Sequence, residues 1–110
     1  MKSLLFLVSS FLVVCFTNFS IALAIDLEQG QALFSQNCAA CHLGGNNTIV
    51  PEKTLKIEAL EANSKADIQA IVTQVTQGNG AMPAFGGRLS DDEIKDIAAY
   101  VLDQAKSNSW

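Results

Sequence analysis

Cys38-Ala39-Ala40-Cys41-His42 is the stretch of this 110-residue chain that decides its fold. Two cysteines three positions apart, with a histidine directly after the second, form the attachment motif of c-type haem. Residues i and i+3 lie on the same face of a helical turn, so both thiols can reach the vinyl groups along one side of a porphyrin. His42 comes next, and its imidazole can reach the iron as an axial ligand. The motif therefore predicts one covalent haem c per chain, anchored by Cys38 and Cys41 and ligated by His42.

Three other kinds of site could use the same cysteines. A thioredoxin-like redox pair normally follows a strand in a βαβ pattern, whereas the residues before Cys38 have the pattern of a helix. A structural zinc site needs four Cys or His ligands, and the only candidate besides the three residues of the motif is Cys15, which lies in the apolar leader segment. A disulfide between Cys38 and Cys41 would close a very short loop and would stabilise the fold little. Haem attachment is favoured, with the redox pair and the disulfide as alternatives.

Residues 1–24 have the features of a secretory signal peptide. Lys2 supplies a positive start, a mostly apolar run follows, and Ala22-Leu23-Ala24 is a small-x-small cleavage site. The apolar run is short for a membrane span, which needs about 20 apolar residues. We therefore expect cleavage after Ala24, with an uncleaved N-terminal anchor as the alternative.

Cleavage would remove 24 of the 110 residues and leave a single domain of 86, residues 25–110. Losing Lys2 changes the formal net charge from −4 to −5, with six basic side chains against eleven acidic ones. This acidity argues against nucleic acid, which is bound mainly by basic contacts to phosphate, and favours a partner with a basic surface. A chain of this length buries only about 60–65% of its unfolded surface, so the apolar face of a haem would add a needed core.

The sequence predicts an all-α fold, because no segment alternates apolar and polar residues for long. Gly30 lies inside the first helix at a cost of about 1 kcal/mol relative to alanine, which suggests that another backbone approaches it closely. The helices are expected over Asp26–Asn37, from Pro51 to Ala62, from a cap at Asn63 or Ser64 to Gly78, and after the capping box Ser90–Glu93.

Met82 is the candidate for the second axial ligand. It is the only methionine besides Met1, and it lies in a glycine-rich loop over residues 78–87. Pro83 and the nearby glycines allow the backbone to lie flat against a planar cofactor. The alternative is a methionine that fills a gap in the core. Ligation by His42 and Met82 would raise the haem potential and suit electron transfer rather than oxygen or peroxide chemistry.

Two stretches of the chain resemble the cytochrome c6 family, the soluble photosynthetic cytochromes of cyanobacteria and algal plastids. They are the haem motif followed by Gly44-Gly45-Asn46, and Ala81-Met82-Pro83-Ala84-Phe85-Gly86-Gly87-Arg88-Leu89. The similarity extends over the mature chain, through Gln74-Val75-Thr76 to the C-terminal Trp110. All c-type cytochromes share the haem motif, whereas the methionine stretch is much more specific. The resemblance implies a class I cytochrome c fold, in which short helices wrap around one covalent haem.

The resemblance also implies a function and a set of site residues. It implies a monomeric carrier of the thylakoid lumen that takes electrons from the cytochrome b6f complex and passes them to photosystem I. Cys38 and Cys41 would be the thioether anchors, and His42 and Met82 the axial ligands.

Two further residues take their expected roles from the resemblance. Gln74 matches a family glutamine that lies beside the haem and tunes its potential, with a solvated helix residue as the alternative. Arg88 matches an arginine implicated in docking to photosystem I, with an ordinary surface charge as the alternative. The mature chain would start with Ile25 where alanine is common, so the cleavage point is defined to within about one residue.

Two other functions remain open at this point. A respiratory carrier of a bacterial periplasm would have the same ligands and the same physics. A thiol or haem oxidoreductase, such as a small peroxidase-like protein with a labile sixth ligand, could share the Cys-x-x-Cys-His motif.

Overall fold

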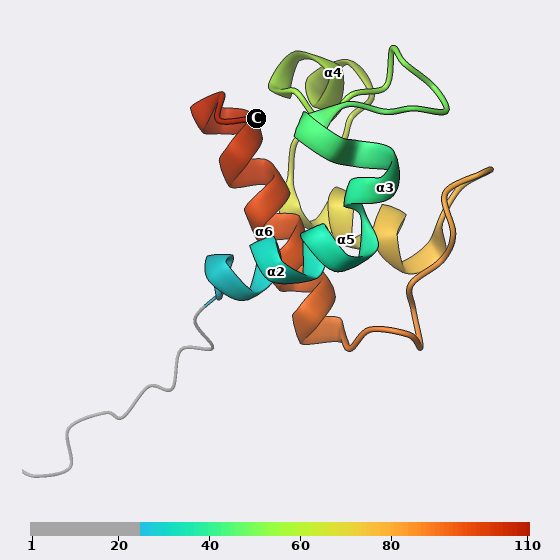
Figure 1. Cartoon of the computed structure of the whole chain (residues 1–110), viewed down its shortest axis with the longest axis vertical. Coiled ribbons are helices and arrows are strands. Elements are labelled where there is room, and N and C mark those ends of the chain that lie inside the picture. Colours follow the sequence, from blue (N-terminus) through green and yellow to red (C-terminus); the bar gives the residue numbers. More distant parts are fainter. Residues whose placement is uncertain (1–24) are drawn as a thin grey trace, which may run out of the picture.

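The computed structural model describes residues 25–110, so the expected signal peptide lies outside the described residues. Figure 1 shows α2 and α6 crossing, with α3, α4 and α5 gathered to one side of this pair. Within residues 25–110 only isolated β-bridges accompany the helices, and the predicted all-α class is confirmed. The helices are α2 (Leu27–Asn37), α3 (Ala39–His42), the 3₁₀ helix η1 (Leu43–Gly45), α4 (Ile57–Ala62), α5 (Ile68–Gln77) and α6 (Asp91–Ser107).

The longest helix, α6, supplies most of the core. It begins with the predicted capping box, in which Ser90 Oγ accepts the Glu93 N–H at 3.1 Å and Glu93 Oε1 accepts the Ser90 N–H at 2.9 Å. One face of the helix is apolar and packs against α2, α4 and α5. Most of its buried side chains recur at helical spacing: Ile94, Ile97, Ala98, Val101, Leu102 and Ala105.

Gly30 lies where α2 crosses α6. A Cβ at this position would collide with the main-chain carbonyl of Asp96 and would lie 2.9 Å from the Cβ of Tyr100. The close approach of a second backbone, which the sequence suggested, is therefore confirmed. Next to the crossing, the Asp26 N–H donates to Asp96 Oδ1 at 3.0 Å and ties the start of α2 to α6.

Replacing Gly30 with alanine is expected to destabilise the protein by about 1–3 kcal/mol, because the two helices must move apart to admit the methyl group. Urea unfolding of the haem-loaded protein, followed by circular dichroism, measures this cost. Gln31→Ala is the matched control, since Gln31 is an exposed neighbour in α2 and its replacement should change stability by less than about 0.5 kcal/mol. Equal stability of the two variants would contradict the close packing of α2 on α6.

The helix that the sequence placed from Pro51 onward begins only at Ile57, so its predicted start was wrong. Residues 51–56 form turns instead, and the Lys53 N–H donates to the Val50 carbonyl at 2.9 Å. Apolar residues at helical spacing are absent from this segment. Proline is common in turns as well as at the first position of a helix, so Pro51 alone does not mark a helix start.

The predicted cap of α5 at Asn63 or Ser64 was also wrong. The cap is Asp67, whose Oδ1 accepts the Ala70 N–H at 2.8 Å. Ser64 has a φ of 56°, and the next residue, Lys65, donates its N–H to the Leu60 carbonyl at 2.7 Å. This left-handed residue therefore closes α4 and does not open α5. No helix within residues 25–110 combines the length and the apolar character needed to cross a membrane.

Candidate haem site

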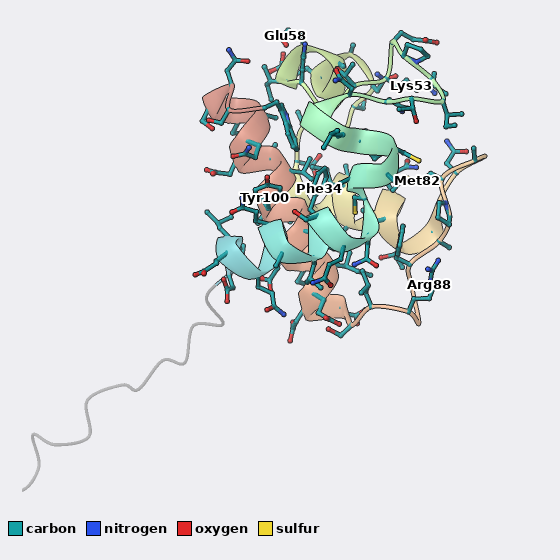
Figure 2. The ribbon with its side chains drawn as sticks, viewed as in Figure 1. Phe34, Lys53, Glu58, Met82, Arg88 and Tyr100 are labelled. Atoms are coloured by element: carbon teal, nitrogen blue, oxygen red, sulfur yellow. The ribbon has the colours of Figure 1, made fainter. Side chains whose placement is uncertain are left out.

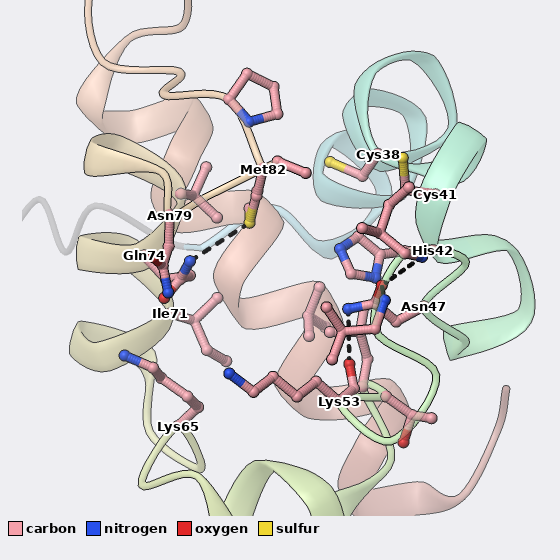
Figure 3. Close-up of a pocket in the computed structure, with 18 of the residues that line it drawn as sticks. Cys38, Cys41, His42, Asn47, Lys53, Lys65, Ile71, Gln74, Asn79 and Met82 are labelled. Atoms are coloured by element: carbon pink, nitrogen blue, oxygen red, sulfur yellow. Dashed lines mark hydrogen bonds between the residues drawn. The ribbon is translucent and has the colours of Figure 1, made fainter.

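A cavity of about 710 Å³ opens between two walls built from distant parts of the chain. One wall carries Cys38, Cys41 and His42, which come from the turn that includes α3. The facing wall carries Gln74 of α5 and Met82 of the following loop, and Figure 3 shows the two sets across the cavity from each other. The structure thus brings together five of the six residues that the sequence singled out.

The first wall is a single helical turn continuing from α2. The Cys38 N–H donates to the Phe34 carbonyl at 2.8 Å, and the His42 N–H donates to the Cys38 carbonyl at 2.9 Å. Cys38, Cys41 and His42 therefore lie within one helical turn, as their spacing predicted. Neither thiol is in a disulfide in the described part of the chain.

The two thiols differ in their surroundings. Cys41 is exposed, whereas burial raises the pKa of the Cys38 thiol to about 11. A raised pKa keeps Cys38 protonated at neutral pH, which is the opposite of what a reactive redox pair requires. The burial of Cys38 therefore argues against a reactive redox pair at this motif.

His42 is held by a backbone carbonyl. Its Nδ1 lies 2.8 Å from the carbonyl oxygen of Asn46, and the imidazole is half-buried in the cavity wall. When Nδ1 carries the proton and donates it to this oxygen, the lone pair of Nε2 is free to bind a metal. A metal-binding histidine is typically oriented in this way.

The second wall is built by a tight turn after α5. Asn79 and Met82 exchange two backbone hydrogen bonds, each 3.0 Å long. A Cβ on Gly78, whose φ is 67°, would lie 2.6 Å from the Met82 carbonyl oxygen, so the turn packs closely against the end of α5. The side chain of Gln74 donates Nε2–H to Met82 Sδ at 3.6 Å (Figure 3).

The residues present fit a covalent haem with two axial ligands. Two thiols supply the atoms for thioether bonds, and an imidazole and a thioether are the ligand pair of cytochromes c. Much of the remaining lining is apolar, as a planar macrocycle requires. These apolar residues come from α2, α4, α5, α6 and the loops between them, and they include Phe34, Leu55, Leu60, Ile71, Val75, Phe85, Ile97 and Val101.

The cavity lining also includes polar residues that the sequence did not indicate, among them Asn47, Lys53 and Lys65. Asn47 organises its own loop, because its Oδ1 accepts the Val50 N–H at 2.8 Å and its Nδ2 donates to the Lys53 carbonyl at 3.0 Å. Asn47 ends the run Gly44-Gly45-Asn46-Asn47, which is a recognisable turn signal, so this loop could have been found from the sequence. Nothing in the local sequence indicates that either lysine reaches the cavity.

Arg88 does not line the cavity but lies against a residue that does. Its Cζ is 5.0 Å from the centroid of the Phe85 ring, and Phe85 is part of the lining. The arginine is exposed, on the outer turn of the loop between α5 and α6 (Figure 2). This position leaves its guanidinium accessible to another protein.

Comparison with known proteins gives consistent matches. Residues 25–101 match the family model described as cytochrome c oxidase, cbb3-type, subunit III. The cytochrome c6 of Porphyra purpurea is 58% identical over 104 residues, covering 94% of this chain and 93% of that protein. The cytochrome c6 of Synechocystis sp. is 62% identical over 85 residues, covering 77% of this chain and 71% of that protein.

Solved structures agree with these relatives. The structure of cytochrome c6 from the diatom Phaeodactylum tricornutum superimposes with a TM-score of 0.74 at 53% identity, covering 77% of this chain and 99% of that chain. Oxidised cytochrome c6A from Arabidopsis thaliana gives a TM-score of 0.73 at 34% identity, covering 77% of this chain and 95% of that chain. The similarity therefore extends over nearly the whole described domain, as the sequence resemblance implied.

Proposed function

The chain belongs to the cytochrome c6 family, and we propose that it carries electrons from the cytochrome b6f complex to photosystem I in the thylakoid lumen. It is a photosynthetic electron-transfer protein rather than an enzyme, and its cofactor is one covalent haem c. The observation that carries the proposal is the meeting of Cys38, Cys41 and His42 with Met82 across one cavity.

Each site residue has a defined task in this function. Cys38 and Cys41 would hold the haem through thioether bonds, and His42 and Met82 would bind its iron. When bound, the haem supplies a one-electron redox couple. The Asn46 carbonyl at His42 Nδ1 strengthens the imidazole as a donor. The amide of Gln74 withdraws electron density from Met82 Sδ.

With His42 and Met82 both bound to it, the iron would be closed to oxygen and peroxide, so the site would be suited to passing electrons. Because the amide of Gln74 weakens the sulfur as a donor to the oxidised iron, it should raise the haem potential. A raised haem potential suits a protein that accepts electrons from a donor complex and passes them to an acceptor complex.

Residues 1–24 would direct the chain across a membrane and be removed, leaving the cytochrome domain of residues 25–110 as a soluble monomer. The small residues Ala22 and Ala24 support cleavage at this point. N-terminal sequencing of the native protein should therefore begin at Ile25 or within about two residues of it. A native protein that retains Lys2 would point to a membrane anchor instead.

Flash-induced absorbance spectroscopy tests the proposed acceptor. The purified haem-loaded protein should re-reduce photosystem I after a laser flash, at a rate that rises with its concentration. The same protein should be reduced by purified cytochrome b6f complex. A protein that reduced a terminal oxidase but neither reacted with photosystem I nor with the b6f complex would instead be a respiratory carrier of the periplasm.

Reversing the charge of Arg88 is expected to slow electron transfer to photosystem I by about tenfold at low salt. An exposed arginine can form a bidentate pair with a partner carboxylate, and losing such a contact costs about 1.4 kcal/mol for a tenfold effect. The measurement is a flash titration of Arg88→Glu at several salt concentrations. The spectrum and potential should stay nearly unchanged, because Arg88 lies outside the cavity lining.

Lys106→Glu is the matched control for this charge reversal. Lys106 is also exposed, but it lies in the last turn of α6, far along the chain from the Met82 loop. Its reversal makes the same change in net charge and should alter the rate much less. Equal rates for wild type and Arg88→Glu at every ionic strength would make Arg88 an ordinary solvated charge.

A further inference from the structure

The C-terminal residue, Trp110, is held in place by both apolar and polar contacts. Its ring centroid lies 5.5 Å from that of Phe34 and 6.0 Å from that of Tyr100. Its indole Nε1–H donates to the Leu55 carbonyl at 2.9 Å. The hydrogen bond fixes the orientation of the indole ring, which apolar packing alone would leave less defined.

Trp110 also lies directly on Gly45. A Cβ on Gly45 would be 2.5 Å from the Cγ and Cδ2 atoms of the indole, so only glycine fits beneath the ring. The Gly45 carbonyl in turn accepts the Leu55 N–H at 2.7 Å. Trp110 therefore contacts both ends of the segment 45–55 and fastens them to each other.

This segment carries the hydrogen-bond partner of His42. Asn46, which directly follows Gly45, places its carbonyl oxygen 2.8 Å from His42 Nδ1. The same segment supplies part of the cavity wall, through Asn47, Ile49 and Val50 among others. Any displacement of Gly45 therefore moves the carbonyl that orients the imidazole.

We propose that Trp110 is a positioning residue for His42. By holding Gly45 and Leu55, it keeps the Asn46 carbonyl at Nδ1 and so sets the strength of His42 as a donor to the iron. The inference rests on the proposed function, in which His42 is an axial ligand. A hydrogen bond accepted from Nδ1–H makes the imidazole more basic, and a more basic ligand favours oxidised iron, so loosening the bond raises the potential.

The test compares Trp110→Phe and Gly45→Ala in the haem-loaded protein. Trp110→Phe keeps an aromatic ring but loses the N–H, and Gly45→Ala displaces the ring from its other side. Gly44→Ala is the matched control: Gly44 also has a positive φ, 64°, but its Cβ would meet only Asn46 Nδ2, at 3.6 Å. The readouts are the midpoint potential and the paramagnetically shifted proton resonances of the haem methyls and His42 in the oxidised protein.

Both Trp110→Phe and Gly45→Ala should raise the midpoint potential. At a fixed ambient potential, the ratio of oxidised to reduced protein should therefore fall by about two- to tenfold, which is the effect expected from weakening one hydrogen bond. Both should shift the His42 and haem methyl resonances, whereas Gly44→Ala should leave potential and resonances close to wild type. A lower melting temperature with unchanged potential and resonances would overturn the proposal and make Trp110 a core residue only. If Trp110→Phe does not accumulate with haem, the midpoint potential and the resonances of Gly45→Ala alone test the proposal.

The wild-type spectrum separates this inference from the proposed function. A wild-type protein without the low-spin spectrum of a histidine–methionine haem would refute the proposed ligation itself. A wild-type protein with that spectrum, together with variants that match it in potential and resonances, would overturn only the role of Trp110.

Discussion

Replacing Cys38 and Cys41 together with serine is expected to abolish covalent haem attachment. Serine has nearly the same size, but its hydroxyl does not form a thioether with a vinyl group. Acidified acetone should therefore extract all pigment from the double variant and leave the haem on the wild-type protein. Mass spectrometry of the intact chain should show the added mass of one haem in the wild type alone.

The same change should cost several kcal/mol of stability, because a domain of about 86 residues has a small core and depends on its cofactor. Ala39→Ser is the matched control, since it changes a residue between the two cysteines without removing a thiol. Extraction of the haem from wild-type protein, or its retention by the double variant, would refute the assignment of Cys38 and Cys41.

Replacing Met82 with alanine is expected to open the iron and lower the haem potential by on the order of 100 mV, since axial ligands set this potential over a wide range. The absorption band that a methionine–iron bond gives in the oxidised protein should disappear. Potentiometric titration and the oxidised visible spectrum measure the two effects. An unchanged oxidised spectrum would return Met82 to the role of a core side chain.

Gln74→Leu provides the matched comparison for this variant. It removes the amide that donates to Met82 Sδ but leaves the sulfur available to the iron. The potential should therefore fall by a smaller amount, and the methionine–iron band should persist. A potential equal to that of wild type would make Gln74 an ordinary helix residue that does not act on the haem.

The parts of the fold that could be predicted are those that depend on neighbours in the chain. The spacing of Cys38, Cys41 and His42 defines one helical turn, and the capping box of Ser90 and Glu93 marks the start of α6. Gly30 could be interpreted because a glycine inside a helix costs stability, and the close approach of another backbone is a reason for its presence there. Each of these signals is contained within a few residues.

The start of α4 and the cap of α5 could not be predicted in the same way. Asn63, Ser64 and Asp67 are all good capping residues, and the choice among them depends on how Ser64 ends the preceding helix in a left-handed conformation. The sequence contains several acceptable boundaries, and the left-handed turn at Ser64 leaves Asp67 as the cap of α5.

By itself, the sequence predicted the kind of cofactor, the anchors Cys38 and Cys41 and the ligand His42, because covalent attachment and helical spacing are local properties. It pointed to Met82 as the second ligand because this is the only methionine besides Met1 and lies in a glycine-rich loop. Only the tertiary structure decided which other groups act on those ligands. Trp110 reaches Leu55 across 55 positions, so this contact exists only after the helices have packed. Hydrogen bonds between distant segments follow from the relative placement of whole elements, and no local pattern of residues encodes that placement.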